Sequence, residues 1–504
     1  MMPRKKTLSP LPVGIAALLF PLVATYATDR SCESLAQLKT PHVSVTLAKE
    51  VNSGQFNAPG SSEVLTDLPP FCRVVVQIAS TADSRIGAEI WLPLTHWNNK
   101  LLAVGSGGWG GAISYDALAE GLRRGYSASA TDDGHTDAGG RFVMGHPEKL
   151  IDFAYRAEHE MTLEAKRLIT ALYGQVPVHS YWSGCSGGGR EGLLQAARYP
   201  QEFDGIVVGD PANIRRNAWA LWLAVQTFKD PDARIPPEKY PMIHQAVLDA
   251  CDASDGLKDG LIGEPERCHP DFKALECKGA DDPSCLTPRQ VQSAQAITSP
   301  LKTSTGEILF PRLEPGTELR WARLTGGPEP AALFLDEYRY VVYGKLDWDW
   351  RTFDVDRDAA KAHAIDSRVD EFDPNLTAFA SRGGKLLIYH GWADQQVAPG
   401  SSVEFYNAAR EHSSVDRSLS DWIRLFMAPG MGHCQGGEGP DTFDALGALE
   451  HWVEKGHAPE RIVASQLKNG HVERTRPLCP YPQVARYDGK GSADDEASFV
   501  CRLP

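Results

Sequence analysis

Short apolar runs alternate with helical patterns in two separate blocks of this chain, and this alternation constrains the fold more than any other feature. In the first block, residues 70–210, runs such as CRVVVQIA and KLLAVGSGG are typical of strands, and HEMTLEAKRLITALYG carries apolar residues at helical spacing. The second block begins at GKLLIYHGWAD and continues through the helix TFDALGALEHWVEKG to the strand RIVASQ. Such alternation predicts an α/β fold with a parallel or mostly parallel sheet.

Stretches rich in Trp, Pro and Asp separate the two blocks and hold four of the ten cysteines. This composition indicates an inserted domain. We predict a lid at 213–378 and a sheet domain built from 28–212 and 379–504. Because open α/β sheets bind ligands at the carboxyl ends of their strands, we expect the lid to lie over that edge.

The first 27 residues have the features of an export signal. Three basic residues at 4–6 precede an apolar stretch at 13–23, and small residues near 25–27 supply a cleavage site. The alternative is a membrane anchor, but this stretch is shorter than the roughly 20 residues that span a bilayer. No other stretch is apolar for long enough. We predict a secreted or periplasmic protein without membrane contact after cleavage.

The charge of the chain excludes one class of partner. The formal net charge is −14, and no cluster of Lys and Arg follows residue 6. Nucleic-acid binding depends on such clusters. We therefore predict no nucleic-acid partner.

Ten cysteines in an exported chain predict disulfides, because oxidising compartments favour them. Sequence alone does not fix the connectivity. A metal–thiolate cluster is the alternative, and the absence of any CxxC spacing disfavours it. Closing short local loops is the simplest scheme, which leaves one distant pair: Cys32–Cys72, Cys251–Cys268, Cys277–Cys285, Cys479–Cys501, and then Cys185–Cys434.

The stretch GCSGG at 184–188 fits the pattern G-x-S-x-G, with an apolar strand before it and a helix after it. Small neighbours permit a sharp turn that exposes the hydroxyl of Ser186. A serine is a weak nucleophile unless a histidine accepts its proton and a carboxylate orients that histidine. The order along such chains is Ser, acid, His, and both Asp394 and His433 follow strands of the second block. We predict a Ser186–His433–Asp394 triad in an α/β-hydrolase fold.

Other residues compete for the acid and the base. Asp210 in VVGDPAN also follows a strand, although a helix or turn cap explains it equally well. We prefer Asp394, which lies one strand–helix unit before His433. The competing histidines are His135, His390 and His451. Lone histidines are usually structural, whereas His433 lies in a Gly-rich loop next to a cysteine.

The distant cysteine pair adjoins the predicted catalytic residues, since Cys185 precedes Ser186 and Cys434 follows His433. A bridge would hold their Cα atoms about 4.4–6.8 Å apart. A displacement of about 1 Å can cost on the order of a hundredfold in rate. The bridge would also remove a competing, oxidisable thiol. A purely stabilising role is compatible with the same pairing.

An oxyanion hole needs preorganised N–H donors. We predict the N–H of Gly187 as one donor, and the other from GSGGWGG after the strand KLLAV, with Gly108 preferred and Gly107 next. This stretch matches neither nucleotide-binding glycine pattern, G-x-G-x-x-G or G-x-x-x-x-G-K-[ST].

The stretch CDASDGLKDGLIGEPERC predicts a structural calcium site. Three carboxylates lie between glycines in a loop that two cysteines would close, and calcium takes six to eight oxygens. A solvated acidic turn is the alternative, and an EF-hand is excluded because the bidentate glutamate is missing. The predicted ligands are three side chains and two backbone carbonyls: Asp252, Asp255, Asp259, Leu257 and Leu261.

Taken together, GCSGGGREGL, GDPAN, the acidic loop, HGWADQQVAP and GMGHCQGG resemble the tannase and feruloyl esterase family, which includes the hydrolase of mono(2-hydroxyethyl) terephthalate. The resemblance extends from about Cys32 to Cys501. It implies the same triad, the bridge beside it, the local cysteine pairs and the calcium ligands.

The resemblance implies a small aromatic ester as the substrate, with a lid that supplies the pocket walls. Trp392 is a candidate wall, with core packing as the alternative, and Arg339 is a candidate partner for a substrate carboxylate, with a solvated side chain as the alternative. Two other functions stay open at this point: an exported serine peptidase, and a non-catalytic binding module on the same fold.

Overall fold

A nine-stranded mixed sheet organises the molecule, in the order β1-β4-β5-β7-β6-β8-β9-β12-β13. The predicted signal at 1–27 lies outside the residues that the structure describes. The computed structural model describes residues 30–213, 215–325, 328–369, 373–414 and 421–504.

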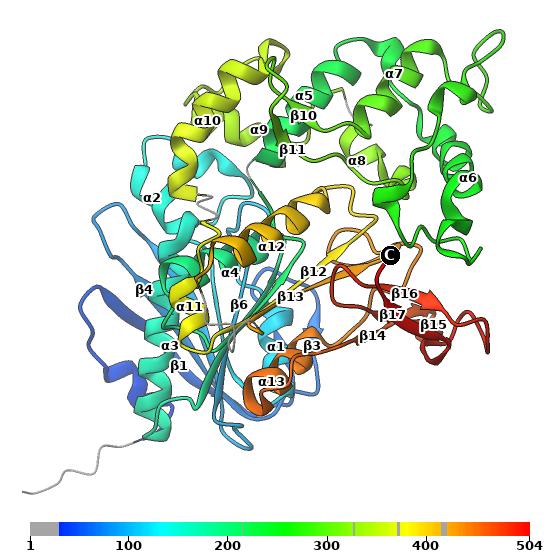
Figure 1. Ribbon diagram of the computed structural model, residues 1–504. Coiled ribbons are helices and arrows are strands. Elements are labelled where there is room, and N and C mark those ends of the chain that lie inside the picture. The colour runs from blue at the N-terminus through cyan, green and yellow to red at the C-terminus, as the bar shows by residue number, and fades with distance from the viewer. Residues whose placement is uncertain (1–29, 214, 326–327, 370–372, 415–420) are drawn as a thin grey trace, which may run out of the picture.

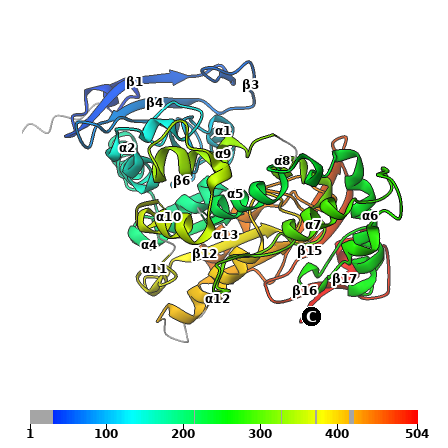
Figure 2. The same cartoon turned by 90° about the horizontal axis from the view of Figure 1, so that it is seen from above.

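Six neighbouring strands of this sheet run parallel, as the alternating pattern predicts. Three strands at one edge pair antiparallel instead, and Figure 2 shows β1 and β4 of this edge in blue. The edge strands are β1 (Val43–Val51), β4 (Phe71–Ile78) and β5 (Ile86–Pro93). The parallel strands are β7 (Ser127–Thr131), β6 (Lys100–Val104), β8 (His179–Cys185), β9 (Gly205–Gly209), β12 (Lys385–Gly391) and β13 (Ile423–Ala428).

Helices cover both faces of the sheet, and each face has its own apolar core. Alternate side chains of a strand point to opposite faces, so both cores draw on the same strands. One core packs against α3 (Ala157–Tyr173), α4 (Gly187–Arg198) and α12 (Gly400–His412). The other packs against α1 (Tyr115–Arg123) and α13 (Ala445–Lys455).

The inserted segment leaves the sheet after β9 and returns to the adjacent strand β12. It forms a mainly helical layer, green to yellow in Figure 1, above one end of the sheet. Large buried side chains, among them Trp219, Trp321 and Tyr338, give this layer an apolar cluster of its own. Its main elements are α5 (Arg215–Thr227), α6 (Tyr240–Cys251), α7 (Pro288–Ile297), β10 (Leu301–Lys302), β11 (Ile308–Phe310), α8 (Ala322–Thr325), α9 (Ala332–Asp336) and α10 (Val355–Val369).

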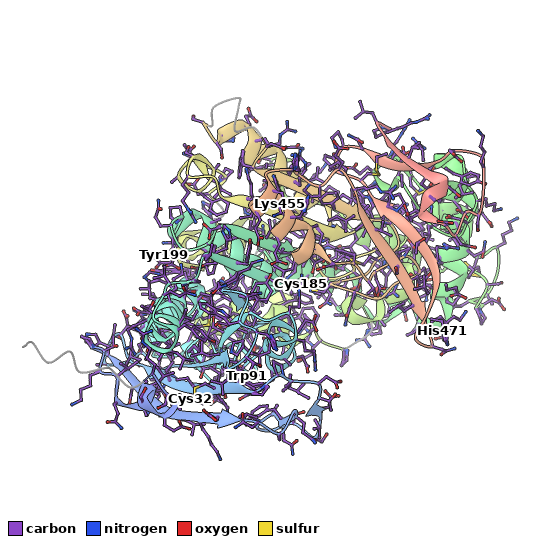
Figure 3. All side chains as sticks on the ribbon, turned by 90° about the horizontal axis from the view of Figure 1, so that it is seen from below. Cys32, Trp91, Cys185, Tyr199, Lys455 and His471 are labelled. Atoms are coloured by element: carbon purple, nitrogen blue, oxygen red, sulfur yellow. A yellow bond between two sulfur atoms is a disulfide. The ribbon has the colours of Figure 1, made fainter. Side chains whose placement is uncertain are left out.

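One predicted strand has a different partner from the one that the alternating pattern implies. RIVASQ forms β14 (Ile462–Lys468), which pairs antiparallel with β15 (His471–Leu478) outside the main sheet. The reason is local: Asn469 and Gly470 both have positive φ, 53° and 79°. Asn-Gly is the strongest short signal for a tight hairpin turn. Figure 3 labels His471 where this turn ends.

All ten cysteines are paired, in the connectivity that the local-loop scheme predicts. Four bridges join residues between 8 and 40 positions apart. The fifth, Cys185–Cys434, joins residues 249 positions apart. In Figure 3, Cys185 is labelled near the middle of the molecule and Cys32 beside the blue edge strands. None of the helices in the described ranges has the length and apolarity that crossing a bilayer requires.

Candidate active site

Ser186 occupies a strained turn between β8 and α4. Its φ is +61°, a value that non-glycine residues seldom adopt. Glycines make the turn possible, because a Cβ at Gly184 would lie 2.5 Å from the backbone carbonyl of Gly188. The surrounding backbone fixes the turn, since the N–H of Ser186 donates to Gly209 (2.9 Å). The turn therefore places Ser186 between β8 and α4, where its Oγ contacts His433 Nε2.

Three side chains from three strand ends form one chain of hydrogen bonds. Ser186 follows β8, Asp394 follows β12, and His433 follows β13. His433 Nε2 lies 2.8 Å from Ser186 Oγ, and Nδ1 lies 2.7 Å from Asp394 Oδ2. With the Nδ1 proton donated to the carboxylate, Nε2 is free to accept the hydroxyl proton. The structure thus brings together the serine, histidine and aspartate predicted from the sequence.

Asp394 is held as an ionised acceptor. Burial alone would raise the pKa of its carboxyl, but His433 and His390 outweigh that effect and hold the pKa well below its usual range. Oδ1 also accepts the N–H groups of Gln396 (2.6 Å) and Val397 (3.0 Å). Hydrogen bonds to the charged form favour that form. The carboxylate is therefore suited to orient His433 and to balance its charge.

The Cys185–Cys434 bridge lies directly beside this chain of hydrogen bonds. The Cα atoms of the two cysteines are 6.0 Å apart. Each cysteine is the chain neighbour of a predicted catalytic residue, Ser186 or His433. The bridge therefore ties together two loops that lie 249 positions apart in the sequence. Its two cysteines directly adjoin the residues of the Oγ–Nε2 contact.

The glycine-rich loop after β6 lies against the first turn of α4. The N–H of Gly188 donates to the carbonyl of Ser106 at 2.7 Å. A Cβ placed on Gly187 would lie 3.3 Å from the backbone nitrogen of Gly108, which has φ +60°. The two predicted oxyanion donors thus lie on adjacent backbone segments. A Cβ on Gly107 would meet nothing within 4 Å.

Two buried acids, Asp133 and Glu191, hold the glycine-rich loop through Ser106. The hydroxyl of Ser106 lies 2.5 Å from Asp133 Oδ2 and 2.7 Å from Glu191 Oε1. One hydroxyl proton can satisfy only one of two carboxylates, so one of these acids keeps its own proton and donates it to Ser106. Burial, followed by repulsion from Glu191, raises the pKa of Asp133 well above its ordinary value. Glu191 Oε2 also accepts the N–H of Ser106 at 3.0 Å.

In the described structure, none of the competing residues takes the place of Asp394 or His433 in the hydrogen-bond chain to Ser186. His135 is buried, stacks on Phe142 and contacts the carbonyl of Trp109 through Nε2 at 2.6 Å; burial lowers its pKa to about 4. His451 is exposed on α13. Asp210 and His390 lie together behind Asp394, where neither contacts Ser186 in the described structure.

Two residues of the inserted layer reach the site without any sequence signal. Arg320 Nε lies 3.5 Å from the position of a Cβ on Gly432, and its Nη1 pairs with Glu438 at 2.7 Å. Leu333 Cδ1 lies 3.5 Å from the position of a Cβ on Gly108. Neither residue belongs to a recognisable motif. The layer therefore covers both the histidine loop and the oxyanion loop.

The two pocket candidates are placed differently. Trp392 is only 5% exposed and belongs to a core cluster, which favours the packing alternative. Arg339 lies in the π-helix Glu337–Val342, within electrostatic reach of Asp336. No contact described for Arg339 joins it to Ser186 or His433.

The acidic loop of the inserted layer is folded around its own carboxylates. Asp252 Oδ2 accepts the N–H of Gly260 at 3.0 Å, and Asp255 Oδ1 accepts that of Leu257 at 2.9 Å. Burial raises the pKa of Asp255 to about 6. Asp259 Oδ2 binds Arg476 Nη2 at 2.6 Å. The donor chemistry fits calcium, but in the described geometry the three carboxylates are not among the acidic groups that converge within 4.8 Å.

Comparisons with known proteins agree on one family for this chain. Residues 72–502 match the family model for tannase and feruloyl esterase. The chain is 36% identical to an uncharacterized esterase of Xanthomonas campestris pv. campestris, over 95% of this chain and 92% of that relative. It is 32% identical to a probable feruloyl esterase B-2 of Aspergillus fumigatus, over 94% and 96% of the two chains.

A solved structure agrees. The crystal structure of feruloyl esterase B from Aspergillus oryzae superposes with a TM-score of 0.89 at 32% identity, covering 94% of this chain and 99% of that one. Its fold is the one predicted from the alternating pattern and the G-x-S-x-G turn. The chain therefore belongs to the tannase and feruloyl esterase family, and it is a carboxylic ester hydrolase with an α/β-hydrolase fold.

Proposed function

We propose that this enzyme is a serine esterase that hydrolyses esters of aromatic acids, with Ser186, His433 and Asp394 as its catalytic triad. The observation that carries the proposal is the unbroken chain of hydrogen bonds from Ser186 Oγ through His433 to Asp394. The names of the relatives, feruloyl esterase B and B-2, support a hydroxycinnamate as the acid.

The reaction follows from the geometry. His433 Nε2 takes the Ser186 proton as Oγ forms a bond to the ester carbonyl carbon. The N–H groups of Gly187 and Gly108 stabilise the oxyanion. The carbon–oxygen bond to the alcohol then breaks, and His433 gives its proton to the leaving alkoxide. Water, activated by the same imidazole, attacks the acyl group and releases the acid and Ser186.

A substrate panel tests the acid preference and separates the competing functions. We expect kcat/KM to be highest for methyl ferulate, lower for methyl gallate and mono(2-hydroxyethyl) terephthalate, and much lower for the amide of ferulic acid. Amide cleavage at a comparable rate would favour a serine peptidase. No turnover of any ester would favour a binding module and contradict the proposal.

We also propose that the protein is exported. Five disulfides suit an oxidising compartment, and residues 1–27 have the pattern of a cleaved signal. N-terminal sequencing of the native protein tests this. The mature chain should begin close to residue 28.

We further propose a structural calcium ion in the loop that Cys251–Cys268 closes. Binding would draw the Asp252, Asp255 and Asp259 carboxylates together, with the carbonyls of Leu257 and Leu261. Free calcium at 100 times its Kd would stabilise the fold by about 2.7 kcal/mol. We expect Tm to fall on EDTA treatment of the parent, and Asp255→Asn to remove this difference.

The control for the calcium prediction is Asp249→Asn, an exposed aspartate just before the loop. It should keep the parent's response to EDTA. Mass-spectrometric metal analysis should find about one calcium per chain in the parent. Equal Tm values with calcium and with EDTA would contradict the proposal.

The Ser106 anchor gives a prediction about Glu191. Glu191→Gln can accept the N–H of Ser106 and donate to its hydroxyl, so we expect nearly parental stability and kcat. Glu191→Ala leaves the buried N–H of Ser106 without its acceptor and the hydroxyl with Asp133 alone, which should cost about 1–3 kcal/mol of unfolding free energy. It should also lower kcat, because the oxyanion loop loses its support. Equal behaviour of the two variants in urea unfolding and in kcat would contradict this role.

The same anchor predicts a pH dependence of stability. Because the pKa of Asp133 is raised on folding, the folded state binds more protons than the unfolded state. The contribution of Asp133 to the unfolding free energy should therefore decrease as pH rises above the ordinary aspartate pKa of about 3.9. Glu191→Gln removes the negative charge that repels Asp133. The unfolding free energy of this variant should therefore decrease less steeply with pH than that of the parent. A slope equal to that of the parent in urea titrations would contradict the assignment.

A further inference from the structure

Two of the residues that compete in the sequence for the acid and the base, Asp210 and His390, lie together behind Asp394. His390 is the penultimate residue of β12 and Asp210 follows β9, and both side chains are fully buried. Buried polar residues of this kind are costly unless each is hydrogen-bonded. The proposed mechanism uses neither of them.

The surroundings of His390 fix its protonation. Nε2 lies 3.1 Å from Asp394 Oδ2, 3.1 Å from the carbonyl of Val397 and 3.5 Å from Asp210 Oδ1. The ionised carboxylate of Asp394 and the backbone carbonyl of Val397 are both acceptors. Nε2 therefore carries a hydrogen and donates it. On the other side of the ring, Nδ1 lies 2.7 Å from the hydroxyl of Ser402.

His390 completes the hydrogen bonding of the Asp394 carboxylate. Oδ1 already accepts two backbone N–H groups, from Gln396 and Val397. Oδ2 accepts one N–H from His433 and one from His390. Without His390, the oxygen that orients His433 would lose the imidazole N–H that helps to keep it in place.

Asp210 links this arrangement to the disulfide. Its Oδ1 accepts the N–H of Gly391 at 3.0 Å, and its Oδ2 lies 3.5 Å from the Sγ of Cys185. Its backbone has φ +37°, which is unusual for a residue other than glycine. Strain of this kind clusters at functional sites. One carboxylate thus touches both His390 and the bridge beside Ser186.

We propose that His390 is a positioning residue of this esterase, whose Nε2–H holds Asp394 Oδ2 in line with His433 Nδ1, while Ser402 and Asp210 hold His390. The inference rests on the proposed function, because it assigns a role relative to the same triad. It explains why Asp210, although it follows a strand like Asp394, is not the catalytic acid. Asp210 supports the histidine behind that acid.

The physical reason for the effect is orientation. A carboxylate that turns away from Nδ1 leaves His433 in the wrong tautomer or the wrong plane, and orientation errors of this kind reduce kcat without changing substrate binding. His390 touches no reacting atom. Its loss should therefore appear in kcat and leave KM nearly unchanged.

A pair of amide substitutions tests the proposal. The amide of His390→Gln can reach the place of Nε2 and donate to Asp394, whereas the amide of His390→Asn reaches only the place of Nδ1. Both variants are polar, neutral and smaller than the parent side chain. We expect His390→Gln to keep kcat for methyl ferulate within about fivefold, and His390→Asn to lose about 30- to 100-fold in kcat at unchanged KM.

Fluorophosphonate labelling of Ser186, followed by mass spectrometry, should show the same order of rates. If His390→Asn does not fold, Ser402→Ala takes its place, since it removes the partner of Nδ1 alone. We then expect a several-fold loss of kcat with KM unchanged and a folded circular dichroism spectrum. Equal kcat in His390→Asn and His390→Gln, or an unaffected Ser402→Ala, would overturn the inference.

Measurements on the parent enzyme distinguish a failure of the proposed function from a failure of the role of His390. A parent that neither turns over methyl ferulate nor labels at Ser186 contradicts the proposed function, and the inference falls with it. A parent that does both, with an Asn variant as active as the Gln variant, contradicts only the role of His390.

Discussion

Replacing Ser186 by alanine should reduce kcat for methyl ferulate by about 10⁴- to 10⁶-fold, the range expected when a residue of a serine triad is removed. The reason is the 2.8 Å contact between Ser186 Oγ and His433 Nε2. Without Oγ no acyl-enzyme forms, and only water held near the oxyanion donors remains as the nucleophile. Steady-state assays at high enzyme concentration measure the loss. Stability should change little, because the half-buried serine side chain fills little of the core.

His433→Ala and the Ser186→Ala/His433→Ala double variant serve as controls. Residues that act as one unit have non-additive effects. The double variant should therefore be no slower than Ser186→Ala within a few-fold. A double variant slower by the product of the two single losses would mean that Ser186 and His433 act separately.

The second large effect is expected from removing the bridge beside the site. Cys185→Ala/Cys434→Ala should lower kcat by about a hundredfold, because without the bridge the loops of Ser186 and His433 can shift, and a displacement of about 1 Å can cost that much in rate. The chain should remain folded, although losing a bridge that closes a loop of 249 residues should cost about 2–5 kcal/mol. We suggest measuring kcat well below the Tm of the variant, with circular dichroism on the same sample.

The matched control removes a bridge whose cysteines adjoin neither Ser186 nor His433 in the sequence, Cys479–Cys501, which ties together segments near the carboxyl terminus. This variant should lose stability but keep kcat within a few-fold. If both bridge variants lose only stability, the positioning role of Cys185–Cys434 is wrong. If only the first loses kcat, positioning is supported.

The local chemistry of the site could be predicted from the sequence because short-range sterics determine it. Only glycine fits at Gly184 next to Gly188. The glycine pattern around Ser186 therefore predicts the tight turn directly. Asp394 and His433 follow neighbouring parallel strands, β12 and β13. The loops that carry them therefore lie at the same edge of the sheet. The distant disulfide followed once the other cysteines were assigned to local loops.

Pairing between strands could not be predicted, because an apolar run does not specify its partner. The antiparallel edge strands and the separate β14–β15 hairpin are examples. The hairpin did have a local signal, Asn469-Gly470, which competes with the longer alternating pattern.

The residues that surround and hold the proposed triad could not be predicted from the sequence either. Arg320 and Leu333 reach the site from a layer without regular periodicity. Asp210 and His390 stood out as titratable residues after strands, but their role depends on which oxygen each nitrogen faces. Distances of this kind exist only in the folded chain.

The central claim is that Ser186 becomes covalently acylated during turnover. Quenching the reaction with methyl ferulate in acid during the first turnovers, and mapping the peptides by mass spectrometry, tests it directly. A feruloyl group on the peptide that contains Ser186, absent in Ser186→Ala, is the predicted result. A feruloyl group on any other residue, or rapid turnover with Ser186 unmodified throughout, would contradict the account.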